Sequence, residues 1–282
     1  MSEQVREQLG RYGIWRPAGM LTPGLAALLE ELGFGTLWVG SSPPGDLDLV
    51  ESLLAATTRL TLATSIVNMW QDDARVVAAS FHRVERHYPG RFVLGVGAGH
   101  REATQEYARP FETLANYTDA LLDGGVPRER LVLAALGPRV LRLAAERTAG
   151  AIPYLVTPQY TRQAREVLGP GPVLAPEQKV VLDTDPERAR RLGRARVSRP
   201  YLGLVNYTSN LRRLGWSEAD LSDGGSDALV DALAAWGTGE QVAARLDEHL
   251  AAGADHVCAQ VLTEGDTDPS ENYRELAAAL GL

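Results

Sequence analysis

The hydrophobic pattern along the chain repeats one unit, an amphipathic helix that ends at a glycine and leads into a short apolar strand. Four copies occupy residues 25–39, 77–96, 141–154 and 242–262. Their helical parts carry apolar residues three or four positions apart, which marks one buried face, and the glycine ends the helix in the left-handed conformation. The strands are apolar runs, as expected for strands that are buried on both faces.

Strands that alternate with helices predict a parallel sheet, and eight of them in a chain of this length predict an α/β fold of the (β/α)8 TIM-barrel type. We expect a single domain, 1–282. An open doubly wound sheet is the alternative fold, but the chain lacks the phosphate-binding fingerprint of such a sheet. The expected strands lie near 11–15, 36–39, 60–66, 92–96, 131–134, 151–154, 179–182 and 256–262.

The interval after the seventh expected strand is too long for one helix. Residues 185–197 are predicted to form the helix of the repeat, and residues 198–237 a helical insertion with helices around 201–214 and 227–236. The loop after each strand of a barrel emerges at the C-terminal ends of the strands, where barrel active sites lie. The insertion is therefore a candidate lid over the active site.

Composition narrows the class of protein. The net charge of −8 argues against nucleic acid as the main partner, and no apolar run approaches the roughly 20 residues of a membrane span. The polar N-terminus lacks a signal-peptide core. We expect a cytoplasmic protein with a small-molecule substrate and no nucleic-acid or membrane partner. The oligomeric state is open, and residues 74–81 are apolar enough to allow a homodimer contact.

Several barrel chemistries lack their residues in this chain. Aldolases that form a Schiff base need a buried lysine, and Lys179, the only lysine, is expected at the start of its strand, away from the active-site end. The five histidines are scattered without ligand spacing, so no metal site is expected. The paired carboxylates of glycoside hydrolases are not visible at the strand ends. The residues expected at the carboxyl ends of the strands are rich in glycine, aromatic and hydroxyl groups. Such a site suits a cofactor that brings its own chemistry.

The fourth expected strand ends in the sequence Leu-Gly-Val-Gly-Ala-Gly-His, residues 94–100. Gly95, Gly97 and Gly99 have no Cβ, so a flat ligand can lie against the backbone there. The G-x-G-x-G spacing, followed by a polar loop, differs from a dinucleotide-binding turn. His100 is the best-placed titratable group for moving a proton; its alternative role is that of a loop histidine bonded to the backbone.

Four segments, taken in order, resemble the luciferase-like monooxygenase superfamily of flavin and deazaflavin barrels. They are 13–15, 63–68, 94–100 and 237–257. The chain is most similar to the actinobacterial branch that uses coenzyme F420, and its arginine-rich, lysine-poor composition agrees with that origin. The resemblance implies an oxidoreductase that moves a hydride between F420 and a small organic substrate. An FMN-dependent monooxygenase is the first alternative, and a non-catalytic flavin-binding barrel is the second.

The resemblance also implies roles for individual residues. A non-prolyl cis peptide at Ser65–Ile66 would support the ring, the glycine loop would flank it, and Thr157 and Thr161 would hold the cofactor phosphate. The expected cofactor-binding residues are Trp15, Ser65, Ile66, Asn68, Gly97, Ala98, Gly99, Thr157 and Thr161. His100 is the expected catalytic residue, and Trp70, Asn206 and Tyr207 are expected to contact the substrate.

One departure from the family pattern concerns acid–base groups. A family member that oxidises glucose 6-phosphate has Asp-His after strand two and Glu after strand four. This chain has Gly40 and Ser41 at the first position and His100 near the second. The departure argues against sugar dehydrogenation and leaves His100 as the candidate acid–base residue.

Overall fold

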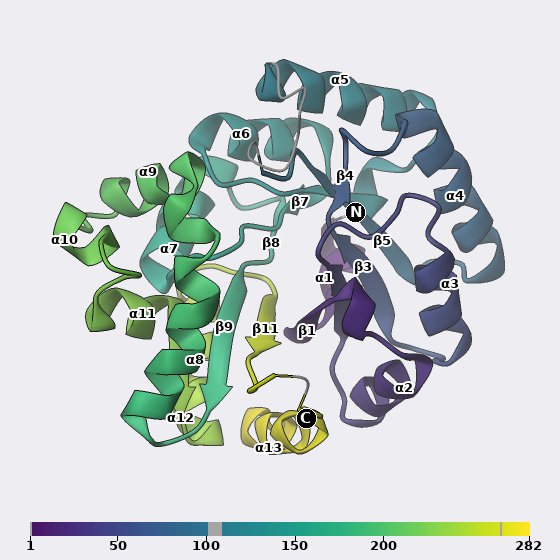
Figure 1. Ribbon diagram of the computed structural model, residues 1–282. Helices are drawn as coiled ribbons and strands as arrows, with labels where there is room; N and C mark the ends of the chain where they lie inside the picture. Colours follow the sequence, from purple (N-terminus) through teal and green to yellow (C-terminus); the bar gives the residue numbers. More distant parts are fainter. Residues whose placement is uncertain (1, 101–108, 266) are drawn as a thin grey trace.

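The structure, a computed structural model, describes residues 2–100, 109–265 and 267–282. Parallel strands form a curled sheet with helices packed around its outside (Figure 1). The strands are β1 (Tyr12–Pro17), β2 (Thr36–Gly40), β3 (Thr61–Ser65), β4 (Val67–Asn68), β5 (Phe92–Gly97), β6 (Leu131–Leu133), β7 (Gly150–Ala151), β8 (Val173–Leu174), β9 (Glu177–Leu182), β10 (Ala234–Gly237) and β11 (Val257–Val261). Their order is β10-β9-β11-β1-β2-β3-β5-β6-β7-β8, and β4 pairs with β5.

The helices follow the strands as the repeat predicts. The α-helices are α1 (Ser2–Leu9), α2 (Pro23–Glu31), α3 (Asp48–Ala55), α4 (Ala74–His87), α5 (Pro110–Asp123), α6 (Pro138–Arg147), α7 (Pro158–Leu168), α8 (Pro186–Ser198), α9 (Val205–Arg213), α10 (Glu218–Leu221), α11 (Asp227–Leu233), α12 (Gly239–Ala251) and α13 (Ser270–Leu280). Short 3-10 turns are η1 (Ala18–Met20), η3 (Arg128–Arg130) and η4 (Tyr201–Gly203). Thr22, Asp185 and Thr238 cap their helices by accepting a backbone N–H of the first turn.

The two ends of the curled sheet meet on one extended segment, residues 173–182. β8 and β9 are separated only by Ala175 and Pro176. The Ala175 N–H donates to the Ala151 carbonyl of β7 at 3.0 Å, and the Cys258 N–H of β11 donates to the Pro176 carbonyl at 2.9 Å. The segment therefore acts as the seventh strand and links the sixth strand to the eighth. The predicted α/β fold of the TIM-barrel type is confirmed.

Two details of the sheet differ from the prediction. The sixth strand is only Gly150–Ala151, because Pro153 has no N–H to donate to a ladder. Residues 227–236 were predicted as one helix, but α11 ends at Leu233 and β10 follows it. β10 pairs with β9 in the register Ala234 to Lys179, so pairing with a neighbouring strand overrides the helical pattern at the end of the insertion.

The insertion forms a helical layer beside α8, and Figure 1 shows α9, α10 and α11 grouped on that side of the sheet. Its apolar side chains make a cluster of their own that includes Leu204, Leu211, Leu229 and Leu233. The Arg199–Pro200 peptide, which opens the insertion, is cis. The insertion is thus a packed part of the fold. None of the described helices has the length and apolar character that a membrane crossing requires.

Two buried histidines, His249 and His256, form hydrogen bonds that connect elements far apart in the sequence. Trp38 Nε1 donates to His256 Nε2 at 3.0 Å, and His256 Nδ1 lies 2.9 Å from the Gly10 carbonyl. His249 of α12 places Nδ1 2.8 Å from Thr161 Oγ1 and Nε2 2.9 Å from Gln178 Oε1. Burial lowers the pKa of His256 to about 4 and that of His249 to about 3, so both rings are neutral at pH 7.

These two histidines predict a loss of stability in mild acid. Their folded-state pKa values lie below the roughly 6.5 of an unfolded histidine, so the unfolded chain binds protons first as the pH falls. Stability is complete above pH 6.5 and decreases toward the folded pKa values. At pH 5.5 we expect a loss of about 1 kcal/mol for each histidine. Urea unfolding at pH 7.5 and 5.5 measures this loss, and in His256→Gln the difference should shrink by about half; an unchanged difference would contradict the assignment.

Candidate active site at the carboxyl ends of the strands

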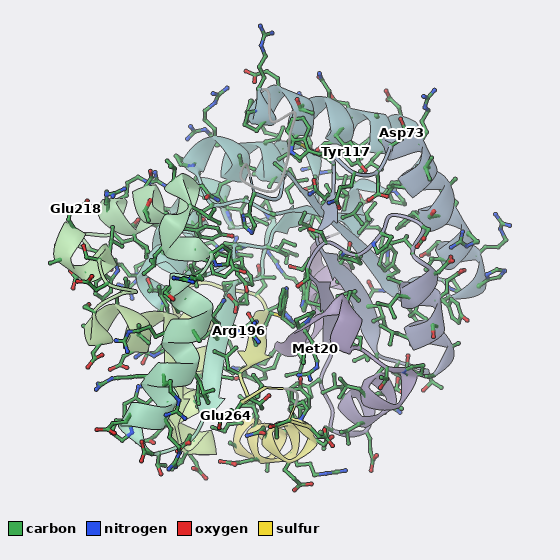
Figure 2. All side chains as sticks on the ribbon, in the orientation of Figure 1. Met20, Asp73, Tyr117, Arg196, Glu218 and Glu264 are labelled. Carbon is green, nitrogen blue, oxygen red and sulfur yellow. The ribbon has the colours of Figure 1, made fainter. Side chains whose placement is uncertain are left out.

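A cavity of about 550 Å³ opens where the strands end. This volume is in the range of pockets that hold small-molecule ligands. Its lining comes from the ends of β1, β3 and β7, the loops after β2, β5 and β6, the start of α5 and the insertion. Figure 2 shows that side chains also fill the interior of the curled sheet below.

Most of the residues predicted for the site meet at this cavity. Those that line it are Trp15, Ser65, Ile66, Asn68, Ala98, Gly99, His100, Asn206 and Tyr207. The peptide bond between Ser65 and Ile66 is cis, at the position that the resemblance implied. The fold therefore brings the ends of β1, β3 and β5 together with the insertion, and the roles of these residues toward a ligand stay predictions.

The glycine loop is held from behind by Trp70 and Asn68. The Trp70 indole Nε1 donates to the Ala98 carbonyl at 2.9 Å, and the Trp70 N–H donates to Asn68 Oδ1 at 3.1 Å. Gly99 has a φ of +58°, and a Cβ on it would lie 2.8 Å from Asn68 Nδ2. Only glycine therefore fits here beside the Asn68 amide.

Two residues predicted for this loop lie outside the cavity lining. Trp70 was expected to contact substrate, but it is absent from the cavity lining and its indole holds the backbone of the loop. Gly97 was expected to flank the ring, but a Cβ there would lie 2.8 Å from the Ala134 Cβ. Gly97 thus permits close packing of neighbouring strands and does not form the cavity wall.

The predicted phosphate site is also not formed by the expected side chains. Thr157 is buried and caps α7, where its Oγ1 accepts from the Tyr160 N–H. Thr161 is fully buried, and its hydroxyl lies between His249 and the Thr157 carbonyl. Neither threonine lines the cavity, because the first turn of α7 packs against α12 and the sheet.

The Trp15 indole lies across the end of β2, beside Gly40. A Cβ on Gly40 would collide with the Trp15 ring, so the glycine allows the indole to lie across the end of β2. Trp15 is 7% exposed, and its Nε1 is buried without a hydrogen-bond partner among the described residues. Ser41 and Ser42 follow in left-handed backbone conformations and line the cavity. An indole N–H and two hydroxyls thus lie at this part of the cavity wall.

Sequence reasoning found only two of the four residues on one side of the cavity. We call this side the aromatic wall and define it as His100, Tyr154, Tyr201 and Tyr207; Tyr154 and Tyr201 were missed. The His100 ring centroid lies 5.8 Å from those of Tyr201 and Tyr207, and the two tyrosine centroids are 5.1 Å apart. Tyr201 Oη donates to Tyr154 Oη at 3.1 Å, and Tyr154 Oη donates to Gln260 Oε1 at 2.8 Å. Gln260 on an otherwise apolar strand was the one sequence signal of this arrangement.

Lys179 was placed wrongly by the sequence. It lies inside the barrel, fully buried, with its Nζ 3.1 Å from Glu177 Oε1 and 3.9 Å from the centroid of the Tyr154 ring. Glu177 Oε2 also accepts from the Leu155 N–H at 3.0 Å. The error arose because the seventh strand begins at Val173, so Lys179 is in its middle. Two opposite charges two residues apart on one strand share a face, a signal that could have revealed the pair.

Burial and pairing act in opposite directions on this ion pair. Burial is the largest effect and lowers the pKa of Lys179 while it raises the pKa of Glu177. Their mutual attraction opposes both shifts. Burial also raises the pKa of Tyr201 to about 12 and the pKa values of Tyr154 and Tyr207 well above 10, so all three hydroxyls are protonated at neutral pH.

The described residues contain no group of three His, Cys, Asp or Glu side chains that could hold a metal ion. The cavity instead combines flat backbone, neutral hydrogen-bonding groups, aromatic rings and one histidine. This fold and site define the class of α/β barrels that bind an organic ligand at the carboxyl ends of their strands.

Comparison with known proteins gives a partial family match. Residues 21–123 match the family model described as luciferase-like monooxygenase. No match is found among curated proteins. The family match over residues 21–123 agrees with the resemblance that the sequence motifs indicated.

Solved structures extend the likeness over nearly the whole chain. An F420-dependent secondary alcohol dehydrogenase, solved with an F420–acetone adduct, has a TM-score of 0.74 at 15% identity, covering 96% of this chain and 98% of its own. The F420-dependent tetrahydromethanopterin reductase of Methanopyrus kandleri has a TM-score of 0.70 at 14% identity, with 96% and 98% covered. The FMN-bound oxygenating constituent of 3,6-diketocamphane monooxygenase from Pseudomonas putida has a TM-score of 0.68 at 14% sequence identity, and 95% of each chain is covered. At these identities the likeness establishes the fold.

The buried ion pair predicts a coupled effect on stability. Lys179→Met leaves the Glu177 carboxylate without its partner, and Glu177→Gln leaves a buried ammonium, so each single change should cost about 3 to 5 kcal/mol of unfolding free energy. The double variant carries no buried charge and should recover most of that loss. Urea unfolding of the four proteins gives the coupling energy. Strictly additive losses would show that the two side chains do not act as a pair.

Proposed function

We propose that the protein is an F420-dependent oxidoreductase that moves a hydride between the cofactor and a small organic substrate. The observation that carries this proposal is the make-up of the cavity lining. Flat backbone at Ser65–Ile66 and Ala98–Gly99 faces a space whose described lining offers His100 as its only group suited to proton transfer at neutral pH. Such a site depends on a cofactor for its redox chemistry, and the F420-dependent structural neighbours support the choice of cofactor.

The residues present fit a flat heteroaromatic ligand. Gly99 keeps its position clear of a Cβ, and Asn68 Nδ2 lies beside it. Trp15 Nε1 is a buried donor that lacks an acceptor among the described residues, as expected for a group that a ligand satisfies. We assign Ser65, Ile66, Ala98 and Gly99 to contact with the ring, and Asn68 and Trp15 to hydrogen bonding. When bound, F420 would supply the centre that accepts or releases a hydride.

Among the described lining residues, His100 is the one whose protonation suits the reaction. Oxidation of an alcohol requires a base for the hydroxyl proton, and reduction of a carbonyl requires an acid for the oxygen. The three tyrosines of the aromatic wall are protonated at neutral pH and cannot be that base. A ring nitrogen of His100 takes the proton in oxidation and returns it in reduction, while the wall and the insertion limit access of water.

FMN-dependent monooxygenation is the second candidate function. The FMN-bound structural neighbour supports it, and the groups of the cavity lining are compatible with either tricyclic ring. The two candidates share the site assignments and differ in the cofactor and in the use of oxygen.

Cofactor binding tests the proposal directly. Titration of the purified protein should show F420 binding at micromolar concentrations and weaker binding of FMN. Gly99→Ala should weaken F420 binding about tenfold, since its Cβ meets the Asn68 amide and its φ is left-handed. Gly24→Ala on α2, where a Cβ meets nothing, is the matched control and should bind normally. FMN binding tighter than F420 binding would favour the second candidate, and no binding of either would refute both.

The role of His100 is tested by turnover. With an alcohol or ketone that a screened panel shows to be a substrate, His100→Ala should lower kcat by about 100-fold or more, while F420 affinity stays near the wild-type value. His87→Ala, on the exposed end of α4, serves as the control for loss of a histidine. Unchanged turnover in His100→Ala would exclude it as the acid–base group.

A further inference from the structure

The described residues that line the cavity carry no ionic side chain apart from the charge that His100 can bear. Its described lining contains no Asp, Glu, Lys or Arg, and its polar groups are hydroxyls, amides and the ring of His100. Arg139 contacts the Phe111 ring, with its guanidinium carbon 4.0 Å from the ring centroid, but Arg139 does not line the cavity. A charged substrate group placed against the described lining would therefore lose its hydration without gaining an opposite charge from it.

The buried charges beside the wall are paired with each other, while Arg196, which acts on both Lys179 and Tyr201, does not line the cavity. Glu177 and Lys179 are buried beneath the aromatic wall, they neutralise each other, and neither lines the 550 Å³ cavity. The Lys179 ammonium lies 3.9 Å from the Tyr154 ring centroid and 5.2 Å from that of Tyr201. Its cation–π contacts act on the rings of the wall and help to fix their positions.

The aromatic wall itself is assembled from separate segments and is held firmly. Tyr201 comes from η4 and Tyr207 from α9, so two of its four rings belong to the insertion. Hydrogen bonds from Tyr201 to Tyr154 and from Tyr154 to Gln260 restrain two rings, and the Leu-rich core of the insertion packs around Tyr207. Rings fixed in tilted and edge-on contacts offer both faces and edges to a planar guest.

We propose that the substrate subsite of this cavity is the aromatic wall and that it takes an uncharged, planar aromatic or conjugated molecule. The inference rests on the proposed function, because it names the substrate class of that site. The rings supply area and quadrupole contacts, which favour a π-system over a saturated skeleton of equal size. The absence of a counter-charge in the described lining disfavours substrates whose carboxylate or phosphate would lie against the wall. Tyr201 is the specificity-determining residue that the insertion contributes.

Equilibrium binding of four related probes to the purified full-length protein tests this proposal. The probes are 2-naphthol, its saturated analogue 2-decalol, 2-naphthoate and 2-naphthyl phosphate, measured by calorimetry at pH 7.5. We expect 2-naphthol to bind, 2-decalol to bind about tenfold more weakly, and the two anions on the order of 100-fold more weakly or not at all. Anion binding as tight as that of 2-naphthol would overturn the proposal. So would naphthoate binding that strengthens from pH 8 to pH 6, because it would show that His100 provides a counter-charge.

Variants of Tyr201 locate the subsite. Tyr201→Phe keeps the ring and should bind 2-naphthol within about twofold of wild type, whereas Tyr201→Ala should lose about tenfold. Tyr201→Leu keeps apolar bulk without a ring and replaces the alanine variant if that variant does not fold; it should also lose the preference for 2-naphthol over 2-decalol. Wild-type selectivity in both non-aromatic variants would overturn the assignment of Tyr201.

The outcome is separable from that of the proposed function, because the probes bind without any cofactor. Loss of probe selectivity together with normal F420 binding would refute the subsite alone. Normal probe selectivity in a protein that binds neither F420 nor FMN would refute the redox function and leave the subsite as a binding site for neutral aromatic molecules.

Discussion

The extended segment 173–182 is the constraint on which the rest of the structure depends. It is bonded to β7 on one side and to β11 on the other, so it joins the two ends of the curled sheet. Because side chains alternate along a strand, its register also decides which polar groups enter the barrel. Glu177 and Lys179 point inward, whereas Gln178 points outward to His249 and to the Leu233 carbonyl. A shift by one residue would exchange these two sets.

The inward set shapes the candidate site although it does not line the cavity. An ion pair inside a barrel is costly to desolvate, and it persists only with good geometry and further hydrogen bonds. Here the Leu155 N–H and the faces of Tyr154 and Tyr201 supply those contacts. The pair thereby ties the seventh strand to the turn after β7 and to the insertion. The insertion is for this reason one wall of the site, with an apolar core of its own to hold it there.

Small residues at the strand ends decide what the site contains. Gly40 gives room to the Trp15 indole, and Gly99 gives room to the Asn68 amide. In both cases the glycine leaves room for a side chain that reaches over from a neighbouring strand. The mouth of this barrel consequently holds neutral donors and aromatic rings. This make-up accounts for a site with little titratable chemistry of its own.

The sequence by itself determined the repeating helix–glycine–strand unit, the barrel class, the place of the insertion and the residues at most strand ends. These follow from local rules, because helix periodicity, glycine caps and buried apolar runs are properties of neighbouring residues. It also located the Ser65–Ile66 peptide and His100, through motifs that lie within single segments. The tertiary structure alone decided the start of the seventh strand, the strand β10 and the inward position of Lys179. It also buried Thr157 and Thr161 and assembled the aromatic wall. Each of these depends on which segments pair or pack across long sequence separations, and no local pattern encodes that choice.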